Sequence, residues 1–374
     1  MRVSIFCFLL TVALSFGAKG QFAEKFKFWK NDTTPNKDGI FLFPLFYYTP
    51  DTRLAAGAVG VYYFNTAKED ASKDDVASTR LSFVKLLADY TQNRQFDAWS
   101  SWNIFTNEER FLIKGEVRYR NFPDRFYGIG NTTQKEDMER YSYDLFHLKG
   151  LLMRQVFPAF FAGIDFQYAN EFNFQLTDNG ILYQGNIVGY KGGVGTGIGG
   201  VITYDTRDNV VNAYEGHLFE ISSYWNSSNF GGDFNFFNLN AVFNKYWEFR
   251  SHHILAMNVS SRFNFGDVPF LEMATVGGDD LLRGYANNRF RDRHFIGGQL
   301  EYRFPVWRRF GMVTFAGLGD VFSNPSDLSW QTVKFSFGAG LRFSVNTKER
   351  LNLRFDYGLG RNNDAFYIML TEAF

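Results

Sequence analysis

The residue types that could support catalysis are few in this sequence, and they are not spaced as a catalytic site. No Gly-x-Ser-x-Gly nucleophile motif is present, and the only cysteine, Cys7, lies in an apolar stretch at the start of the chain. The sequence contains five histidines: His147, His217, His252, His253 and His294. They show no metal-ligand spacing. We therefore predict that the protein is not an enzyme and uses no metal or cofactor.

A glycine-rich segment over residues 192–200 has the composition of a phosphate-binding loop. It lacks the Lys-Ser/Thr ending of such a loop, and no helix pattern follows it. Glycine at alternate positions is better explained by a β-strand in which small residues leave space or permit strong curvature. We therefore expect a strand here and not a nucleotide site.

One arginine has neighbours that suit a buried ionic contact. Arg283 is followed by Gly284 and Tyr285 in a long segment without strand pattern, and Glu301 lies in the next strand-like segment. A guanidinium that leaves water keeps its charge, and a carboxylate can accept paired hydrogen bonds from it. Gly284 permits a backbone turn with positive φ beside the arginine. Such a pair could carry a mechanistic role or only stabilise the segment, and the sequence leaves both open.

The segments around this arginine alternate apolar and polar residues with the period of β-strands. The pattern is clearest over residues 296–304, 333–344 and 351–358. In water, a sheet with one apolar face needs a second layer to cover it, but no helical segment with an apolar stripe is found. In a membrane, lipid covers that face and the polar face lines a wet interior. We therefore predict an all-β, transmembrane antiparallel β-barrel.

The start of the chain has the features of an export signal, with Arg2 before an apolar stretch and small residues before Gln21. We predict a signal peptide over residues 1–20, a short periplasmic tail over 21–39 and a barrel over 40–374. Cleavage would remove Arg2 and Lys19 and no acid, so 37 basic side chains would face 39 acidic ones. This balance gives no electrostatic footprint for nucleic acid.

Turn signals divide the barrel region into about sixteen strands, an even number that places both termini on the periplasmic side. Short turns then fall mostly on that side and longer loops opposite, although the first two hairpins depart from the pattern. The predicted strands cover residues 40–49, 55–66, 79–91, 97–106, 111–122, 140–152, 161–171, 195–205, 214–225, 236–248, 252–266, 295–305, 310–321, 332–345, 350–358 and 366–374.

The long segment at about 267–294 and the strand after it carry a family resemblance. Leu282-Arg283-Gly284-Tyr285 and the Glu301-Tyr302-Arg303-Phe304-Pro305 segment resemble the signature of the BamA/TamA superfamily of outer-membrane assembly and translocation barrels, the bacterial surface antigen family. The resemblance implies that this sixth extracellular loop folds into the lumen with Leu282, Arg283, Gly284 and Tyr285 at its tip. It also implies that Glu301 is the lumenal acid that the loop arginine approaches.

Two departures from that family affect the interpretation. The family usually has a second acid two residues after the phenylalanine of the thirteenth strand, where this chain has Gly317. The nearest acid is Asp320, and its odd offset from Gly317 points it to the opposite face of a regular strand. Asp320 is therefore a second anchor candidate only if the strand ends or bulges there. Family members also carry periplasmic POTRA modules, and the sequence has no room for one, so we expect a POTRA-less member.

The seam between the first and last strands is the second candidate site. Pro44 has no N–H and would remove one ladder donor if that donor faced the seam. It could equally face the second strand or mark a bulge. The chain ends on Phe374, an aromatic ending by which barrel-assembly machinery recognises its clients, and we expect Phe374 to close the last strand at this seam.

The resemblance implies a protein of the outer membrane that inserts or translocates polypeptides, or assists a machine that does. Its expected partners are outer-membrane lipid and client outer-membrane or secreted polypeptides, with no nucleic acid. The alternative is a passive channel or structural barrel that keeps the fold without the assembly role.

Overall fold

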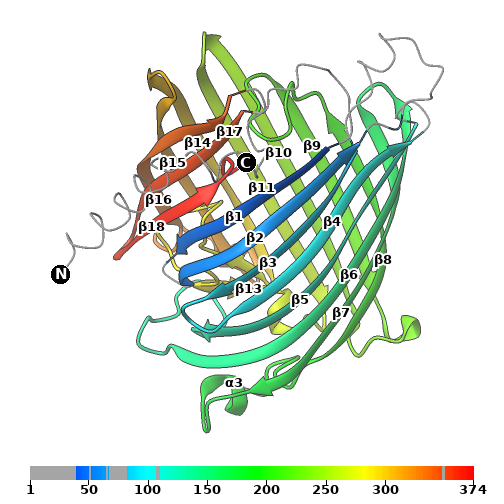
Figure 1. The fold of residues 1–374 in the computed structure, drawn as a ribbon. Coiled ribbons are helices and arrows are strands. Elements are labelled where there is room, and N and C mark those ends of the chain that lie inside the picture. Colours follow the sequence, from blue (N-terminus) through cyan, green and yellow to red (C-terminus); the bar gives the residue numbers. More distant parts are fainter. Residues whose placement is uncertain (1–38, 50–51, 65, 67–81, 107–109, 348–349) are drawn as a thin grey trace, which may run out of the picture.

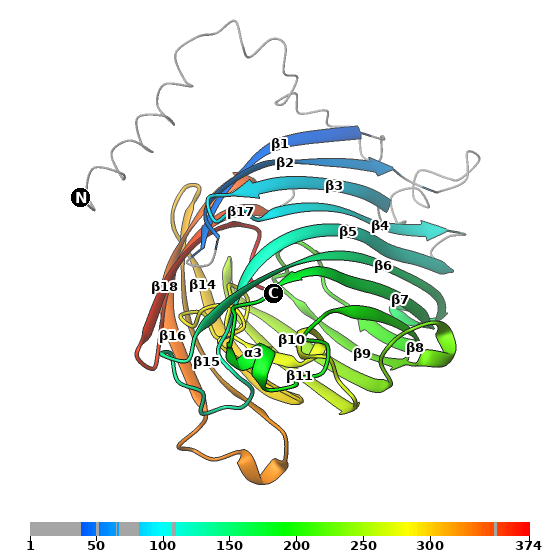
Figure 2. The same cartoon turned by 90° about the horizontal axis from the view of Figure 1, so that it is seen from below.

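The fold is described by a computed structural model that covers residues 39–49, 52–64, 66, 82–106, 110–347 and 350–374. Sixteen antiparallel strands form a closed barrel in which each strand pairs with its neighbours in the chain (Figures 1 and 2). Two further short strands, β12 (Ala274–Val276) and β13 (Phe290–Asp292), form a separate sheet inside the connection between β11 (His253–Gly266) and β14 (His294–Trp307). The predicted fold class is confirmed. The predicted signal peptide and nearly all of the periplasmic tail lie outside the described residues.

The strands have the following bounds: β1 Gly39–Thr49, β2 Arg53–Phe64, β3 Ser82–Thr91, β4 Phe96–Thr106, β5 Phe111–Phe126, β6 Glu139–Phe157, β7 Phe160–Gln175, β8 Gly193–Asp205, β9 Gly216–Asn226, β10 Phe236–Arg250, β11 His253–Gly266, β12 Ala274–Val276, β13 Phe290–Asp292, β14 His294–Trp307, β15 Phe310–Phe322, β16 Lys334–Asn346, β17 Leu351–Gly360 and β18 Asn363–Leu370. The helical segments are α3 Ile181–Gln184 and the 3-10 turns η1 Ser228–Phe230, η2 Phe270–Glu272 and η3 Pro325–Asp327. In the part of the chain that the structure describes, no helix is long and apolar enough to cross a membrane.

Alternation along each strand separates two chemically different faces. On β16, Phe335, Phe337 and Leu341 are exposed, while their neighbours Ser336 and Arg342 are buried. In a closed antiparallel barrel, alternate residues face outward and inward, so the outer surface is apolar and the inner one polar. The period-two pattern in the sequence thus sets which side chains can meet in the interior.

The two rims differ in the length of their connections (Figure 1). At the rim where β1 begins and β18 ends, here called the terminal rim, β6–β7, β10–β11 and β14–β15 are joined by short turns. At the opposite rim, the loop rim, residues 127–138, 176–192 and 267–293 form long connections. Phe270 from the last of these packs in a buried cluster with Phe126, Tyr141, Tyr143 and Leu182. Two connections distant in sequence, 176–192 and 267–293, are thereby packed against each other and against the ends of β5 and β6 at the loop rim.

The last strand is shorter than the sequence pattern predicts. β18 ends at Leu370, and Thr371 adopts a left-handed φ of 80°. The chain therefore leaves the sheet before Glu372, and the predicted strand over 366–374 is wrong at its end. We call residues Thr371–Phe374 the tail.

Candidate functional site

The connection from β11 to β14 brings its middle section against the buried face of β14–β17. β12 and β13 pair from Ala274–Asp292 to Val276–Phe290 and hold the base of this segment together. A buried apolar cluster then supports the tip: Ala274, Val276, Leu282, Tyr285, Phe290, Phe295 and Val321. Two of the predicted tip residues, Leu282 and Tyr285, thus act as packing anchors that hold Arg283 between them in place.

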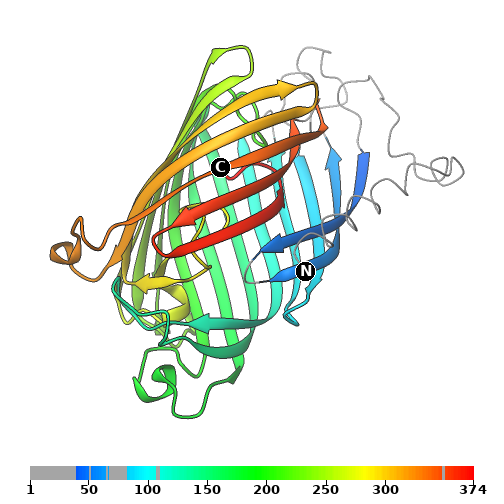
Figure 3. The same ribbon diagram turned by 90° about the vertical axis from the view of Figure 1, so that its left-hand side faces the viewer.

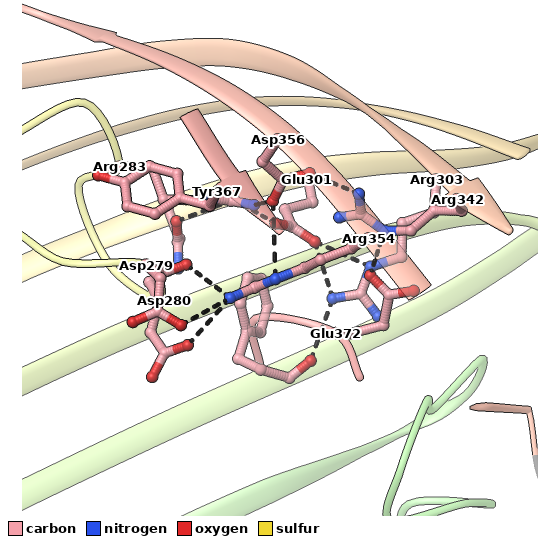
Figure 4. Close-up of polar contacts among 12 residues, drawn as sticks. Asp279, Asp280, Arg283, Glu301, Arg303, Arg342, Arg354, Asp356, Tyr367 and Glu372 are labelled. Carbon is pink, nitrogen blue, oxygen red and sulfur yellow. Dashed lines mark hydrogen bonds and ion pairs between the residues drawn. The ribbon is translucent and has the colours of Figure 1, made fainter. Parts of the chain in front are cut away.

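Arg283 is completely buried and lies between two carboxylates (Figure 4). Its Nη1 donates to Asp356 Oδ2 at 2.6 Å, and its Nη2 donates to Glu301 Oε1 and more weakly to Gln299 Oε1 at 3.4 Å. The guanidinium carbon also lies 3.6 Å from the centre of the Phe315 ring. Glu301 is where the family resemblance implies it, whereas Asp356 from β17 was not expected from the sequence. Two anions and an aromatic face together compensate for the desolvation of one cation.

Gly284 allows the tip to lie directly on the barrel wall. Its φ is 113°, and a Cβ on it would come within 2.8 Å of the Gly360 nitrogen and of Leu359. Its N–H donates to the Tyr367 hydroxyl at 3.1 Å. Both the positive φ and the close backbone approach require glycine at this position.

Tyr285 binds the tip to β16, to β18 and to the turn between β17 and β18. Its hydroxyl donates to the Phe335 carbonyl at 3.1 Å and accepts from the Arg361 N–H at 2.8 Å. Its own carbonyl accepts from the Tyr367 hydroxyl at 3.2 Å. The tip is therefore bound through its backbone and its ring as well as through the arginine.

Three further arginines from the wall surround the two carboxylates. Arg303 Nη2 lies 2.8 Å from Glu301 Oε2, and Arg342 contacts Asp356 Oδ1 and donates to Glu372 Oε2 at 2.7 Å. Arg354 Nη2 donates to Asp279 Oδ2 at 3.0 Å and so holds the loop at a second point. Charge is thus balanced locally by alternating cations and anions across β14, β16, β17, the loop and the tail.

Two of the network groups that lie outside the strands, Arg283 in the loop and Glu372 in the tail, stay ionised. Burial would lower the pKa of Arg283, but Glu301 and Asp356 outweigh burial and raise it above its ordinary value. Burial would raise the pKa of Glu372, but Arg342 and Arg303 outweigh burial and lower it. The contacts between loop, wall and tail are therefore ionic at neutral pH.

Asp320 does not contact Arg283. Its carboxylate accepts from Lys334 Nζ at 2.9 Å and from Asn131 Nδ2 at 3.2 Å. Phe315, which stacks on Arg283, is five residues before it, so an odd offset separates the two along β15. The expectation of Asp320 as a second anchor for Arg283 is corrected, because Asp356 fills that place and Asp320 ties the 127–138 connection to β16.

Phe374 is also placed differently from the expectation that it closes the seam. It packs against a buried cluster of Ala213, Tyr246, Ile254 and Ala256, away from β1. Its main-chain oxygen accepts from Arg303 Nη2 at 3.0 Å. The left-handed turn at Thr371 and the ion pair of Glu372 with Arg342 direct the tail off the sheet and onto these partners.

The seam between β1 and β18 has little strand pairing. Among the described residues, Tyr48 of β1 and Ile368 of β18 are the one pair in register, whereas β17 and β18 are in register from Leu353–Leu370 to Gly360–Asn363. Figure 3 faces this part of the barrel, with β1 in dark blue and β18 in red. Pro44 lies opposite Ala58 of β2, before the one paired position, so it does not interrupt an existing β1–β18 ladder.

Asp356, Arg342 and Glu372 are the residues that sequence reasoning missed. Asp356 and Arg342 occupy polar positions of alternating strands, as many lumenal residues do, so nothing in their spacing distinguishes them. Glu372 did carry a signal, because it breaks the apolar alternation of Phe366, Ile368, Leu370 and Phe374. In the described residues, no group of three or more His, Cys, Asp or Glu side chains could hold a metal ion.

Comparison with known proteins finds one family match and several structures of the same fold. Residues 194–374 match the model of the Omp85 superfamily domain. No curated protein matches the sequence. BamA from Haemophilus ducreyi lacking POTRA domains 1–3 has a similar structure, with a TM-score of 0.59 and 13% identity over 90% of this chain and 70% of that one.

Two solved structures of CdiB are similar as well. The Acinetobacter baumannii protein has a TM-score of 0.57 and 9% identity over 89% of this chain and 59% of that one. The Escherichia coli protein has a TM-score of 0.54 and 10% identity over 90% of this chain and 68% of that one. At these identities the likeness shows a shared barrel fold.

Proposed function

We propose that this protein is an outer-membrane barrel that inserts or translocates polypeptides or assists a machine that does, because residues 194–374 match the Omp85 superfamily domain model and the tip motif resembles the BamA/TamA superfamily. The terminal rim would face the periplasm and the loop rim the exterior. Clients would be unfolded outer-membrane or secreted polypeptides. The observation that carries this proposal is the weak pairing between β1 and β18.

A seam of this kind can open at low cost. Each neighbouring strand pair of a barrel is normally held by a continuous ladder of main-chain hydrogen bonds, each worth about 0.5–1.5 kcal/mol net. Along β1 and β18 only Tyr48 and Ile368 are in register. The unpaired edges on either side offer main-chain donors and acceptors to an incoming strand, as sheet edges do in β-strand addition.

The strands on both sides of this seam are also short, so the barrel wall spans less of the membrane there. β18 has 8 residues and β1 has 11, whereas β6 has 19. Eight residues extend roughly 26 Å along the strand and cover about 20 Å of membrane thickness at the usual tilt. A typical hydrocarbon core is about 30 Å thick, so lipid beside β18 must thin or disorder. Thinner lipid lowers the barrier for a polar chain to enter at this point.

The test is to lock the seam by a disulfide. Tyr48→Cys with Ile368→Cys would join β1 to β18, and Tyr357→Cys with Phe366→Cys, a register pair of β17 and β18, is the matched control. Both pairs are made in a Cys7→Ser background. The purified protein is reconstituted in liposomes, and the folding rate of a urea-denatured eight-stranded outer-membrane barrel is followed by protease protection.

We expect the unmodified protein and the control disulfide to accelerate folding of the probe, and the seam disulfide to abolish the acceleration until a reductant is added. Full acceleration by the oxidised seam variant would contradict the proposal.

A passive channel is the second candidate, favoured by the polar wall opposite the loop. There Arg118 pairs with Asp97, and Lys149 lies 3.6 Å from Asp165, so charged groups line the interior away from the tip. A channel would conduct ions steadily with the tip in place. The conductance of the unmodified protein in planar bilayers therefore distinguishes the two candidates.

A further inference from the structure

The tail and the tip of the loop are joined through Glu301. One carboxylate oxygen of Glu301 contacts Arg283 and the other contacts Arg303. Arg303 in turn donates to the main-chain oxygen of Phe374 at 3.0 Å, and its guanidinium lies 5.2 Å from the centre of the Phe374 ring. A single carboxylate of the wall thus lies between the loop arginine and the arginine that holds the tail.

Asp356 makes a second link of the same form (Figure 4). Its Oδ2 accepts from Arg283 at 2.6 Å, and its Oδ1 accepts from Arg342. The Nε of Arg342 donates to Glu372 at 2.7 Å. Both carboxylates therefore share their two oxygens between the loop and an arginine that contacts the tail.

The six side chains of these two links have no net charge when both ends are seated, and one uncompensated charge when only one end is seated. To the links the wall contributes two cations and two anions, Arg303, Arg342, Glu301 and Asp356, while Arg354 of the wall pairs with Asp279 of the loop. The loop adds the positive charge of Arg283, and the tail adds the negative charge of Glu372. All six side chains are at most 6% exposed, so water screens their interactions poorly.

Beyond Thr371, whose N–H donates to the Asn352 carbonyl at 2.8 Å, the tail is held by side chains and not by strand pairing. Asn352 Nδ2 donates to the second oxygen of Glu372 at 2.8 Å, and the Phe374 ring lies 6.2 Å from that of Tyr246. Thr371, with its φ of 80°, separates the tail from the β18 ladder. The tail can therefore leave its site without unzipping a strand.

We propose that the tail is an internal ligand that holds the loop tip in place through charge balance. Without Glu372, Arg342 and Arg283 share Asp356, so one buried positive charge is left uncompensated and Arg342 repels Arg283. Without Arg283, Glu301 and Asp356 gain an uncompensated negative charge that repels Glu372. Each end therefore stabilises the other, and by linkage the coupling has the same size in both directions. The inference does not depend on what the barrel transports.

The first test measures how often the tip leaves its site. Leu282 is 1% exposed in the tip cluster, so Leu282→Cys in a Cys7→Ser background should react slowly with a water-soluble maleimide. Adding Glu372→Gln, which keeps the shape and removes the charge, should raise the labelling rate at least about fivefold, the low end of ordinary coupling between sites. The matched control is Glu220→Gln, a β9 glutamate bonded to Thr203 outside the network.

The second test runs in the reverse direction. Ala213 is 3% exposed beneath Phe374, so labelling of Ala213→Cys reports departure of the tail. Arg283→Met should raise that rate by the same factor. Labelling of Ala169→Cys, buried in β7 outside this network, should stay unchanged and so exclude general unfolding.

Combining the two charge removals gives the sharpest result. The double variant Arg283→Met with Glu372→Gln leaves two cations and two anions of the wall in balance. The melting temperature of this double variant should therefore fall by less than the sum of the decreases in the two single variants. Residues that do not interact show additive losses. Additive losses, or a Leu282→Cys rate that Glu372→Gln raises no more than Glu220→Gln does, would overturn the inference.

Discussion

Gly358 of β17 lies directly beneath the backbone of Arg283, and a Cβ on Gly358 would come within 2.6 Å of the Arg283 carbonyl carbon. Two positions along, a Cβ on Gly360 would meet the Tyr285 ring at 2.6 Å. The tip and β17 thus approach more closely than side chains allow. The position of Arg283 between Glu301 and Asp356 depends on the absence of side chains at Gly358 and Gly360.

Replacing Gly358 should therefore displace the tip. Gly358→Ala is expected to lower the free energy of unfolding by about 1–3 kcal/mol, as overpacking of a tight contact does. Gly150→Ala is the matched control, because Gly150 lies in β6 with nothing within 4 Å of an added Cβ. Thermal unfolding of both variants in the same detergent provides the comparison. Equal losses in the two variants would show that the close approach to Arg283 is not what matters.

Removing the loop arginine should open the interior to ions. Arg283→Ala leaves Glu301 and Asp356 without their shared cation, and breaking such a buried pair costs about 3–5 kcal/mol. We expect the unmodified protein to show small conductance in planar bilayers and Arg283→Ala to show a clear increase. Arg118→Ala, which removes a cation paired with Asp97 on the other wall, should change it little. A large steady conductance before any substitution would favour the passive channel.

The two candidate acids should behave differently. Asp356→Asn removes a direct partner of Arg283 and is expected to raise maleimide labelling of Leu282→Cys and to lower the free energy of unfolding by about 3 kcal/mol. Asp320→Asn breaks only the contacts with Lys334 and Asn131 and should leave that labelling unchanged. The reverse order of effects would mean that Asp320 and not Asp356 anchors the tip.

The tail contact should weaken in acid. Because the pKa of Glu372 is lowered in the folded protein from its ordinary value of 4.5, its contribution to stability is present above that value and is lost as the pH falls through the lower folded pKa. The melting temperature of the unmodified protein should exceed that of Glu372→Gln by a constant amount above about pH 5.5, and the gap should shrink below about pH 4.5. A gap that widens in acid would contradict the ionic contact.

The local pattern of the sequence determined the strands and their two faces. Alternation of apolar and polar residues depends only on neighbours along the chain, so the strand over residues 310–322 and the glycine-rich strand over 193–205 were predicted to within two residues. The motif around Arg283 likewise predicted that Arg283 approaches Glu301. Each of these inferences rests on residues that are close in sequence or on a motif with a fixed order.

Only the tertiary structure decided which lumenal charges meet. Asp356 reaches Arg283 because β17 passes under the loop, and their separation of 73 residues leaves no trace in the local pattern. The tail turns inward because Arg342 and Arg303 attract Glu372 and the main chain of Phe374, although its apolar spacing predicts a continued strand. Closing a barrel brings distant inward-facing residues to one place, and the energy of burying charge then selects the partners that balance it.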